Sequence, residues 1–271
     1  MEIMLNGVTY SYMLKGEGQA ILLLHGFTGC KENWSFLVES LSKRYKVIAL
    51  DLIGHGQTHS PEVDHRYSFE KVCGDLHDLL DHLSITKVHL LGYSMGGRVA
   101  LAFSIMYPSK VESLILESSS PGLIDEEERF TRIKADHTLA DDILSNGIMA
   151  FVNKWEEIPL FSTQKMLSKQ VKDKIREQRL RNNPVGLANS LKGMGTGIQP
   201  SYWDKLSSIK KPILLLCGEL DPKFCEIAEK MKQRIPQAIV FQIPRVGHAI
   251  HVEQPDVFGK IVDEFLHNNN H

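Results

Sequence analysis

The chain has 271 residues, of which 42% are hydrophobic and 24% are charged, and its formal net charge is −2. This length predicts one large domain, or one domain with an insertion. The ordinary composition is typical of a soluble globular enzyme, and the near-neutral charge gives no global reason to expect nucleic acid or an anionic membrane as a partner.

The first part of the chain alternates between predicted strands and helices. Asn6-Gly7 lies between two alternating segments and predicts an antiparallel hairpin over residues 2–15. Short apolar runs predict strands at 20–25, 46–51, 88–91 and 112–117. Helical patterns lie at 34–42, 67–83 and 97–107. This alternation predicts the α/β class, with a mostly parallel sheet and helices on both of its faces.

The alternation stops at Ser118 and resumes near Pro212. The residues between them are predominantly helical in pattern and include no strong strand, and Asp125 is expected to cap the first helix. Strands at 212–218 and 239–243 and a closing helix at 256–267 follow. We therefore expect a core made of residues 1–120 and 207–271, with an inserted helical cap, residues 121–206, over the strand ends.

The segment 88–97 carries the motif around which a site is expected. The strand 88–91 continues into Gly-x-Ser-x-Gly at residues 92–96, and a helical pattern follows. A strand, a sharp turn and a helix are the context in which this motif indicates a nucleophile elbow. Small residues on both sides of Ser94 let the backbone turn tightly, and the helix N-terminus directs N–H groups at the same place. The alternative is a glycine-rich turn with a chance serine.

A serine needs an imidazole to take its proton and an acid to orient that imidazole. In this architecture the acid and then the histidine follow the serine along the chain. Asp221 follows the strand at 212–218, and His248 follows the strand at 239–243. Both lie where open α/β sheets form their sites. The sequence therefore predicts a catalytic triad of Ser94, Asp221 and His248.

Other residues compete for these two partner roles. Asp221 precedes a proline and can instead cap the helix that follows it. Glu117 also ends a strand, and Glu219 lies close to Asp221, so either can supply the acid. His251 is a nearby competitor of His248. The three predicted positions in the correct order are a more specific signal than any one of them.

Two backbone N–H groups are expected to form an oxyanion hole. One belongs to Met95, which directly follows the predicted nucleophile, and the other to Phe27, in the turn at 25–29 after an apolar strand. Their role is to stabilise negative charge as it develops on an oxygen atom. The alternative for this turn is an ordinary connection between a strand and a loop.

With this site, the whole chain resembles the α/β-hydrolase superfamily. The elbow at 92–98 and the predicted cap narrow the resemblance to the 2-succinyl-6-hydroxy-2,4-cyclohexadiene-1-carboxylate (SHCHC) synthases of menaquinone biosynthesis. The cap segments that carry this resemblance are 128–132, 151–155, 159–161, 179–184 and 195–201. The resemblance implies a lyase that eliminates pyruvate from 2-succinyl-5-enolpyruvyl-6-hydroxy-3-cyclohexene-1-carboxylate, without a cofactor or metal.

The resemblance also implies how the substrate is held. Its carboxylates suit arginine, whose planar fork donates two parallel hydrogen bonds. Arg98 lies one helical turn after Ser94, so it can reach the same cavity. The residues expected to contact the substrate are Tyr93, Arg98, Arg132, Trp155 and Arg179.

The two cap arginines have alternatives. Arg132 lies four residues after Glu128 and can instead form a solvated pair on a helix. Arg129 can replace Arg132 as the substrate contact, and Arg181 can replace Arg179 in the same way. The sequence leaves both choices open, because helical spacing gives the face of a helix and not the reach of each side chain.

The implied mechanism differs from ordinary triad chemistry. Ser94, deprotonated by His248, would act as a base that takes a ring proton, and the oxyanion hole would hold charge on the succinyl carbonyl. The main alternative is a serine hydrolase of a small ester, thioester or C–C bond, which needs no arginine cluster. A non-catalytic receptor on the same fold is the third reading.

The remaining expectations concern partners and compartment. None of the cysteines forms C-x-x-C, which indicates reduced thiols in a cytosolic protein; they are Cys30, Cys73, Cys217 and Cys225. No signal peptide is visible, and the apolar runs are too short to span a membrane. We expect a cytoplasmic monomer or weak homo-oligomer that binds a small polycarboxylate, with no nucleic acid and no membrane insertion.

Overall fold

The computed structural model describes residues 1–269, which form one eight-stranded sheet in the order β1-β2-β4-β3-β5-β6-β7-β8. β2 is antiparallel to both β1 and β4, and the other neighbouring pairs are parallel. The strands are β1 (Glu2–Leu5), β2 (Val8–Lys15), β3 (Ala20–Leu24), β4 (Lys46–Leu50), β5 (Val88–Tyr93), β6 (Val111–Glu117), β7 (Ile213–Gly218) and β8 (Ile239–Ile243). The predicted α/β class and mostly parallel sheet are confirmed.

The first hairpin shows why the local sequence specifies this structure. Asn6 and Gly7 have φ values of 48° and 82°, which is the left-handed backbone that a two-residue hairpin turn requires. Leu5 pairs with Val8 across the turn. The hairpin predicted from Asn6-Gly7 is therefore confirmed, and it forms the edge of the sheet.

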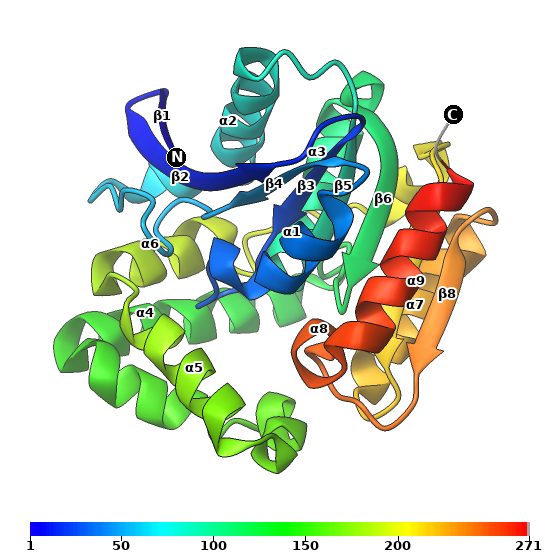
Figure 1. Ribbon diagram of the computed structural model, residues 1–271. Coiled ribbons are helices and arrows are strands. Elements are labelled where there is room, and N and C mark those ends of the chain that lie inside the picture. Colours follow the sequence, from blue (N-terminus) through cyan, green and yellow to red (C-terminus); the bar gives the residue numbers. More distant parts are fainter. Residues whose placement is uncertain (270–271) are drawn as a thin grey trace.

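Helices cover both faces of the sheet (Figure 1). On one face, α1 (Ser35–Leu41) and α9 (Pro255–Asn268) bury apolar side chains against the central strands. The opposite face is covered by α2 (Phe69–His82), α3 (Met95–Met106) and α7 (Pro222–Arg234). A short helix, α8 (Ile250–Glu253), precedes α9. β5 lies at the centre of this sandwich, so the turn after it has firm support on both sides.

The chain between β6 and β7 is helical and gathers at one end of the sheet (Figure 1). It contains α4 (Glu126–Trp155), α5 (Lys169–Leu180) and α6 (Pro184–Met194). The carboxylate of Asp125 accepts a hydrogen bond from the N–H of Glu128 at 2.8 Å, so the predicted cap of this first helix is confirmed. α4 and α6 enclose a small apolar core of their own, made of Ala140, Ile143, Phe151, Val152, Leu187, Ala188 and Leu191.

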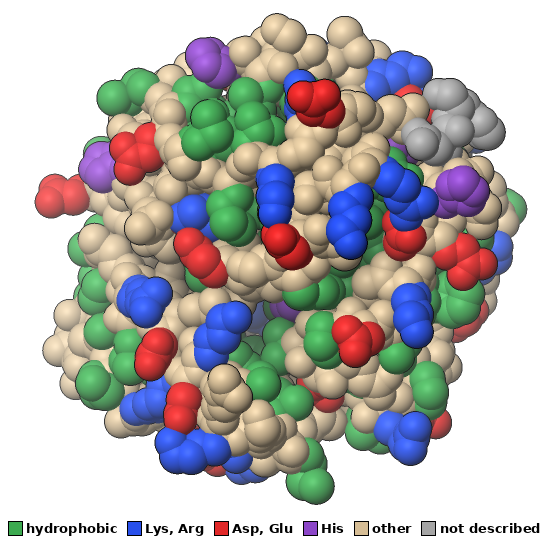
Figure 2. Space-filling view, in the orientation of Figure 1, with side chains coloured by type: hydrophobic (Ala, Val, Ile, Leu, Met, Phe, Trp, Pro, Cys, Tyr) green, Lys and Arg blue, Asp and Glu red, His purple; other side chains and the backbone are tan. Residues whose placement is uncertain are grey.

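The surface is mixed in charge. On the face shown in Figure 2, basic and acidic side chains alternate, in keeping with a net charge of −2. Within residues 1–269, no helix combines the length and apolar character needed to cross a membrane. All four cysteines are free thiols, as the sequence predicted.

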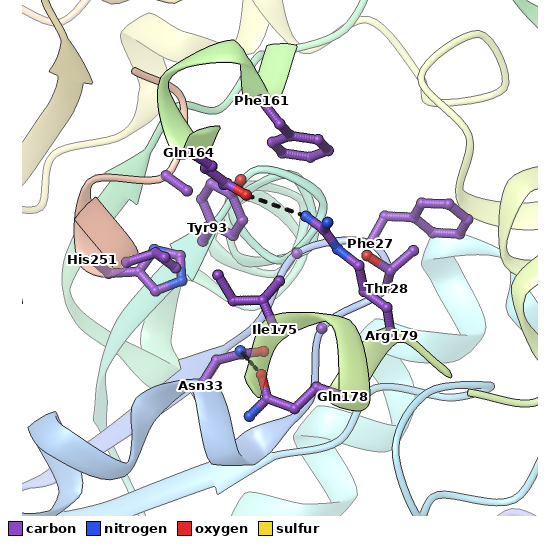
Figure 3. A pocket seen from close by; sticks show the side chains of 14 residues that line it. Phe27, Thr28, Asn33, Tyr93, Phe161, Gln164, Ile175, Gln178, Arg179 and His251 are labelled. Carbon is purple, nitrogen blue, oxygen red and sulfur yellow. Dashed lines mark hydrogen bonds between the residues drawn. The ribbon is translucent and has the colours of Figure 1, made fainter. Parts of the chain in front are cut away.

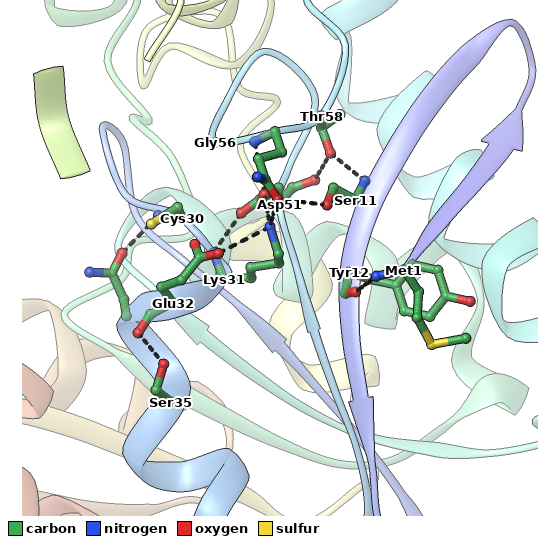
Figure 4. A network of polar contacts seen from close by, with 12 residues as sticks. Met1, Ser11, Tyr12, Cys30, Lys31, Glu32, Ser35, Asp51, Gly56 and Thr58 are labelled. Carbon is green, nitrogen blue, oxygen red and sulfur yellow. Dashed lines mark hydrogen bonds and ion pairs between the residues drawn. The ribbon is translucent and has the colours of Figure 1, made fainter. Parts of the chain in front are cut away.

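A buried ion pair fixes the loops beside β3 and β4 (Figure 4). Lys31 and Asp51 are 4% and 0% exposed, and the ammonium lies 2.7 Å from the carboxylate. The same carboxylate accepts hydrogen bonds from the backbone N–H groups of Lys31 and Gln57, at 2.6 and 2.9 Å. Because these bonds satisfy most of the carboxylate's acceptor sites, the pair can stay buried. It ties together the two loops that flank the turn at 25–29.

Two buried histidines lie in the same region, with ring centroids 5.2 Å apart. His25 accepts a hydrogen bond from the N–H of Leu52 at 3.0 Å, and His55 donates to the carbonyl oxygen of Ile53 at 3.1 Å. Burial lowers the pKa of His25 to about 4 and the pKa of His55 to about 3. Both rings therefore stay neutral in the folded protein between pH 7 and pH 5, whereas the same histidines bind protons in the unfolded chain.

Acid is expected to destabilise the fold through these rings. Between pH 7 and pH 5 the unfolded chain gains a proton on each histidine and the folded chain does not, so each should lower the free energy of unfolding by about 2 kcal/mol. Urea unfolding at the two pH values measures this loss. In His55→Gln the loss should be about 2 kcal/mol smaller than in the unaltered protein. Equal losses in the two proteins would contradict the assignment.

Candidate active site

Ser94 occupies the turn between β5 and α3 with φ 49° and ψ −106°. This backbone conformation is strained for a residue that carries a side chain. The turn is tight because Gly96 lies against the end of β3, where a Cβ atom would be 2.2 Å from the carbonyl oxygen of Leu24. The N–H of Ser94 donates to the carbonyl oxygen of Glu117 on β6 at 2.8 Å. These contacts hold the serine at the carboxyl end of the central strands.

A hydrogen-bonded chain runs from this serine to a carboxylate. Oγ of Ser94 lies 3.1 Å from Nε2 of His248, and Nδ1 of His248 lies 2.7 Å from Oδ2 of Asp221. With its proton on Nδ1, the ring donates to the carboxylate and accepts from the serine hydroxyl. Asp221 stands at the N-cap of α7, yet its side chain forms no capping bond, because it is turned toward His248. The arrangement can move a proton from the serine oxygen to the imidazole.

The competing acids and histidine are engaged elsewhere. Glu117 is fully buried and accepts hydrogen bonds from the N–H and from Nδ1 of His251, at 3.0 and 2.9 Å. His251 therefore pairs with Glu117 and not with Ser94. Glu219 accepts from the N–H of Arg245 at 2.8 Å. Of the acidic candidates weighed from the sequence, only Asp221 contacts the histidine that reaches the serine.

The predicted oxyanion residues lie on two sides of the serine. Met95 is the first residue of α3, and the first N–H groups of a helix have no partner within it. Phe27 lies in the turn after β3 and lines the same cavity as Ser94 and Met95. Gly26 makes this turn possible, since a Cβ atom there would lie 2.6 Å from the ring of Tyr93. The placement of both residues suits N–H donation to an oxygen that develops negative charge.

One cavity of about 230 Å³ separates the serine from the helical segment above it. Most of its wall is apolar or aromatic, which is typical of a small-molecule site. Its aromatic members are Phe27, Tyr93, Trp155, Phe161 and Phe224. Its charged members are Arg98, Arg132, Asp136 and Lys223. The cavity therefore pairs a polarised serine with a mainly positive lining.

Arg98 brings a positive charge into this cavity from α3. Its guanidinium donates to the carbonyl oxygen of Met194 at 2.6 Å and to the side-chain oxygen of Gln199 at 3.4 Å, and both of these acceptors are neutral. Burial and the nearby charge of Arg132 lower the pKa of Arg98 to about 10, so it remains a cation at neutral pH. Arg132 is more open, with a side chain 43% exposed, and pairs with Asp136 at 2.8 Å.

Arg179 lies in a second, smaller cavity of about 40 Å³ (Figure 3). It is 7% exposed, lies over the ring of Phe161 at 4.8 Å, and donates weakly to Gln164 at 3.4 Å. Phe161, Tyr93 and Phe27 line both cavities, so these three residues border the cavity of Arg179 and that of the serine. The structure therefore brings Arg98 and Arg132 into the serine's cavity and leaves Arg179 beside it.

Known proteins share this architecture. The family model of the alpha/beta hydrolase fold matches residues 19–255. A Photorhabdus laumondii protein named 2-succinyl-6-hydroxy-2,4-cyclohexadiene-1-carboxylate synthase is 33% identical over 91% of this chain and 84% of its own. A Bacillus subtilis protein, named provisionally as the same synthase, is 48% identical over 96% of each chain. The structure of MenH from S. aureus covers 97% of this chain and 99% of its own at 37% identity, with a TM-score of 0.92. This chain belongs to the SHCHC synthase family.

Most of the residues predicted for the site share one cavity. The members that line it are Phe27, Tyr93, Ser94, Met95, Arg98, Arg132, Trp155 and His248. Asp221 stands behind His248, and Arg179 lies in the neighbouring cavity. The alternative arginines are turned elsewhere: Arg129 donates to the carbonyl oxygen of Gly197 at 3.3 Å, and Arg181, 73% exposed, pairs with Glu177 at 3.6 Å.

Two charged residues of this cavity were not predicted from the sequence. Asp136 follows Arg132 by four residues, a spacing that resembles an ordinary surface pair, yet it is 4% exposed and lines the cavity. Lys223 lies two residues after Asp221, at the exposed start of α7. Its position just beyond a strand end was the one signal that could have drawn attention to it.

Proposed function

We propose that this chain eliminates pyruvate from 2-succinyl-5-enolpyruvyl-6-hydroxy-3-cyclohexene-1-carboxylate and so forms SHCHC in menaquinone biosynthesis. One observation carries the proposal beyond family membership. The serine of a Ser–His–Asp chain opens into the same cavity as two guanidinium groups, Arg98 and Arg132. A serine hydrolase of neutral esters needs no such cations, whereas a substrate with several carboxylates does.

In the proposed reaction Ser94 is the base. His248, oriented by Asp221, takes the serine proton, and the serine oxygen then takes a proton from a ring carbon. The electrons of the C2–H bond form a C2=C3 double bond, the existing C3=C4 double bond shifts to C4=C5, and the C5–O bond to the enolpyruvyl group breaks. The leaving group departs as the enolate of pyruvate and gains a proton. Charge that reaches the succinyl carbonyl oxygen is held by the N–H groups of Phe27 and Met95.

Arginine and aromatic side chains of the cavity would hold the substrate. Arg98 and Arg132 bind its carboxylates, while Tyr93 and Trp155 pack against its ring. Arg179 would contact it directly only after the Phe161 ring swings aside, since that ring borders both cavities. Such a movement would belong to the helical cap, residues 121–206, which we propose as the part that closes over bound substrate.

The proposed working form follows from the same features. We expect a monomer or weak homo-oligomer that needs no cofactor and acts in the cytoplasm on a small polycarboxylate. The small net charge of −2 and the four free thiols support this expectation.

Pyruvate release tests the proposal. Purified protein should liberate pyruvate from the enolpyruvyl substrate at a rate far above the spontaneous rate, and coupling to NADH oxidation by lactate dehydrogenase makes the release measurable. Folded protein that gives no release above background would exclude this function. Rapid hydrolysis of uncharged p-nitrophenyl esters, unaffected by Arg98→Met, would support the serine hydrolase instead.

A further inference from the structure

Asp136 places a carboxylate in a cavity that otherwise suits anions. It projects from α4 and lines the same cavity as Ser94, and it is 4% exposed. Its Oδ1 accepts from Nε of Arg132 at 2.8 Å. Its Oδ2 is buried and has no hydrogen-bond partner within the described residues. It lies so close to Gly195 that a Cβ atom there would be 2.5 Å away.

Burying Oδ2 of Asp136 costs free energy unless this oxygen accepts a hydrogen bond. Buried polar atoms in folded proteins nearly always have hydrogen-bond partners, and a buried charge requires them most. A carboxylate beside the binding site of an anion also repels that anion. Because the Asp136 carboxylate is unfavourable both when it is buried unpaired and when an anion binds beside it, we expect a compensating hydrogen bond to its free oxygen. A ligand in the cavity can supply this bond.

The chemistry of the ligand identifies the donor. This step rests on the proposed function. The product named for the family carries two carboxylates, one ketone and one ring hydroxyl. At neutral pH all of these groups accept hydrogen bonds, and only the hydroxyl also donates one. Arginine side chains donate and cannot accept, so Arg98 and Arg132 can bind the carboxylates but cannot accept the hydroxyl proton. Of the described residues that line the cavity, Asp136 is the one with a carboxylate, the strongest acceptor for this proton.

We propose that Asp136 accepts a hydrogen bond from the ring hydroxyl and makes the site specific for the hydroxylated ring. Sites that hydrogen-bond a ligand hydroxyl discriminate strongly against the analogue that lacks it, because the polar group of the protein is then left unpaired. With an ionised acceptor, the hydroxyl should contribute about 10- to 100-fold in affinity.

A purely structural role of Asp136 predicts a different result. If Asp136 serves only to orient Arg132, removing the Asp136 side chain weakens the binding of a carboxylate. Ligands with and without the hydroxyl then lose affinity equally. The ratio of the two affinities therefore separates the roles, even where a substitution lowers both affinities.

The experiment measures binding of SHCHC and of the same ring acid without the hydroxyl by calorimetry. The unaltered protein should prefer SHCHC by about 10- to 100-fold. Asp136→Ala should reduce this preference to about threefold or less, and Asp136→Asn should give an intermediate value. The control is Lys223→Met, which removes another charged residue of the cavity, at the exposed start of α7, and should keep the preference. Circular dichroism checks that each variant is folded.

Two results would overturn the inference. One is an undiminished preference for SHCHC in both Asp136 variants, and the other is equal affinity of the unaltered protein for the two ligands. Either result would show that this carboxylate does not recognise the hydroxyl. Both outcomes leave pyruvate release intact and so differ from a failure of the proposed function. In that failure the unaltered protein neither releases pyruvate nor binds either ligand.

Discussion

Ser94→Ala is expected to lower kcat for pyruvate release by about a thousandfold or more, because it removes the atom that takes the substrate proton. The neighbouring groups cannot replace it, since Nε2 of His248 is positioned for the serine oxygen at 3.1 Å and not for the substrate. KM should change much less than kcat, because the arginines remain. Steady-state kinetics with the coupled pyruvate assay measures both constants.

A neighbouring serine provides the control. Ser119 lines the same cavity and its hydroxyl donates weakly to the carbonyl oxygen of Ser94 at 3.4 Å. Ser119→Ala should therefore keep kcat within about tenfold of the unaltered protein. If Ser94→Ala were as active as Ser119→Ala, no mechanism that uses the serine as a base would survive.

The second large effect is expected at Arg98. Arg98→Met should lower kcat/KM by about 30- to 1000-fold, because a substrate carboxylate would then be desolvated without its charged partner. Its two hydrogen-bond acceptors in the protein, Met194 and Gln199, are neutral, so neither of them neutralises the guanidinium charge. Arg98→Lys should recover only part of the loss, since an ammonium lacks the planar fork.

Arg129 is the matched arginine for this comparison. It lies in the same helical segment as Arg132 but bonds to a backbone carbonyl and does not line the cavity. Arg129→Met should leave kcat/KM within about threefold. Equal losses in the Arg98 and Arg129 variants would assign the effect to general electrostatics and remove Arg98 from the binding site.

The fold was largely predictable because its signals are local. Alternating apolar runs and helical patterns gave the strands and helices, and Asn6-Gly7 gave the hairpin. The helix after the nucleophile elbow begins at Met95, whereas the sequence pattern predicted a start at Gly97. The periodicity of apolar side chains does not locate the first turn of a helix. The order of the strands in the sheet depends on long-range pairing and could not be obtained from any single segment.

The site was predictable where chain position decides geometry. Ser94, Asp221 and His248 all follow strands, and the carboxyl ends of parallel strands meet at one edge of the sheet. Side chains on the helical segment were harder, since helical spacing does not fix the direction of a long side chain. Arg179 turns behind Phe161, and Asp136 turns inward where its spacing indicated a surface pair.

The unusual backbone at Ser94 has an evolutionary consequence. A residue with a side chain holds φ 49° and ψ −106° at a cost of about 1–3 kcal/mol, whereas glycine adopts positive φ freely. Selection for heat resistance alone would therefore favour glycine at this position. Only selection for turnover retains the hydroxyl, so the strained backbone at Ser94 and its reactive oxygen are inherited together.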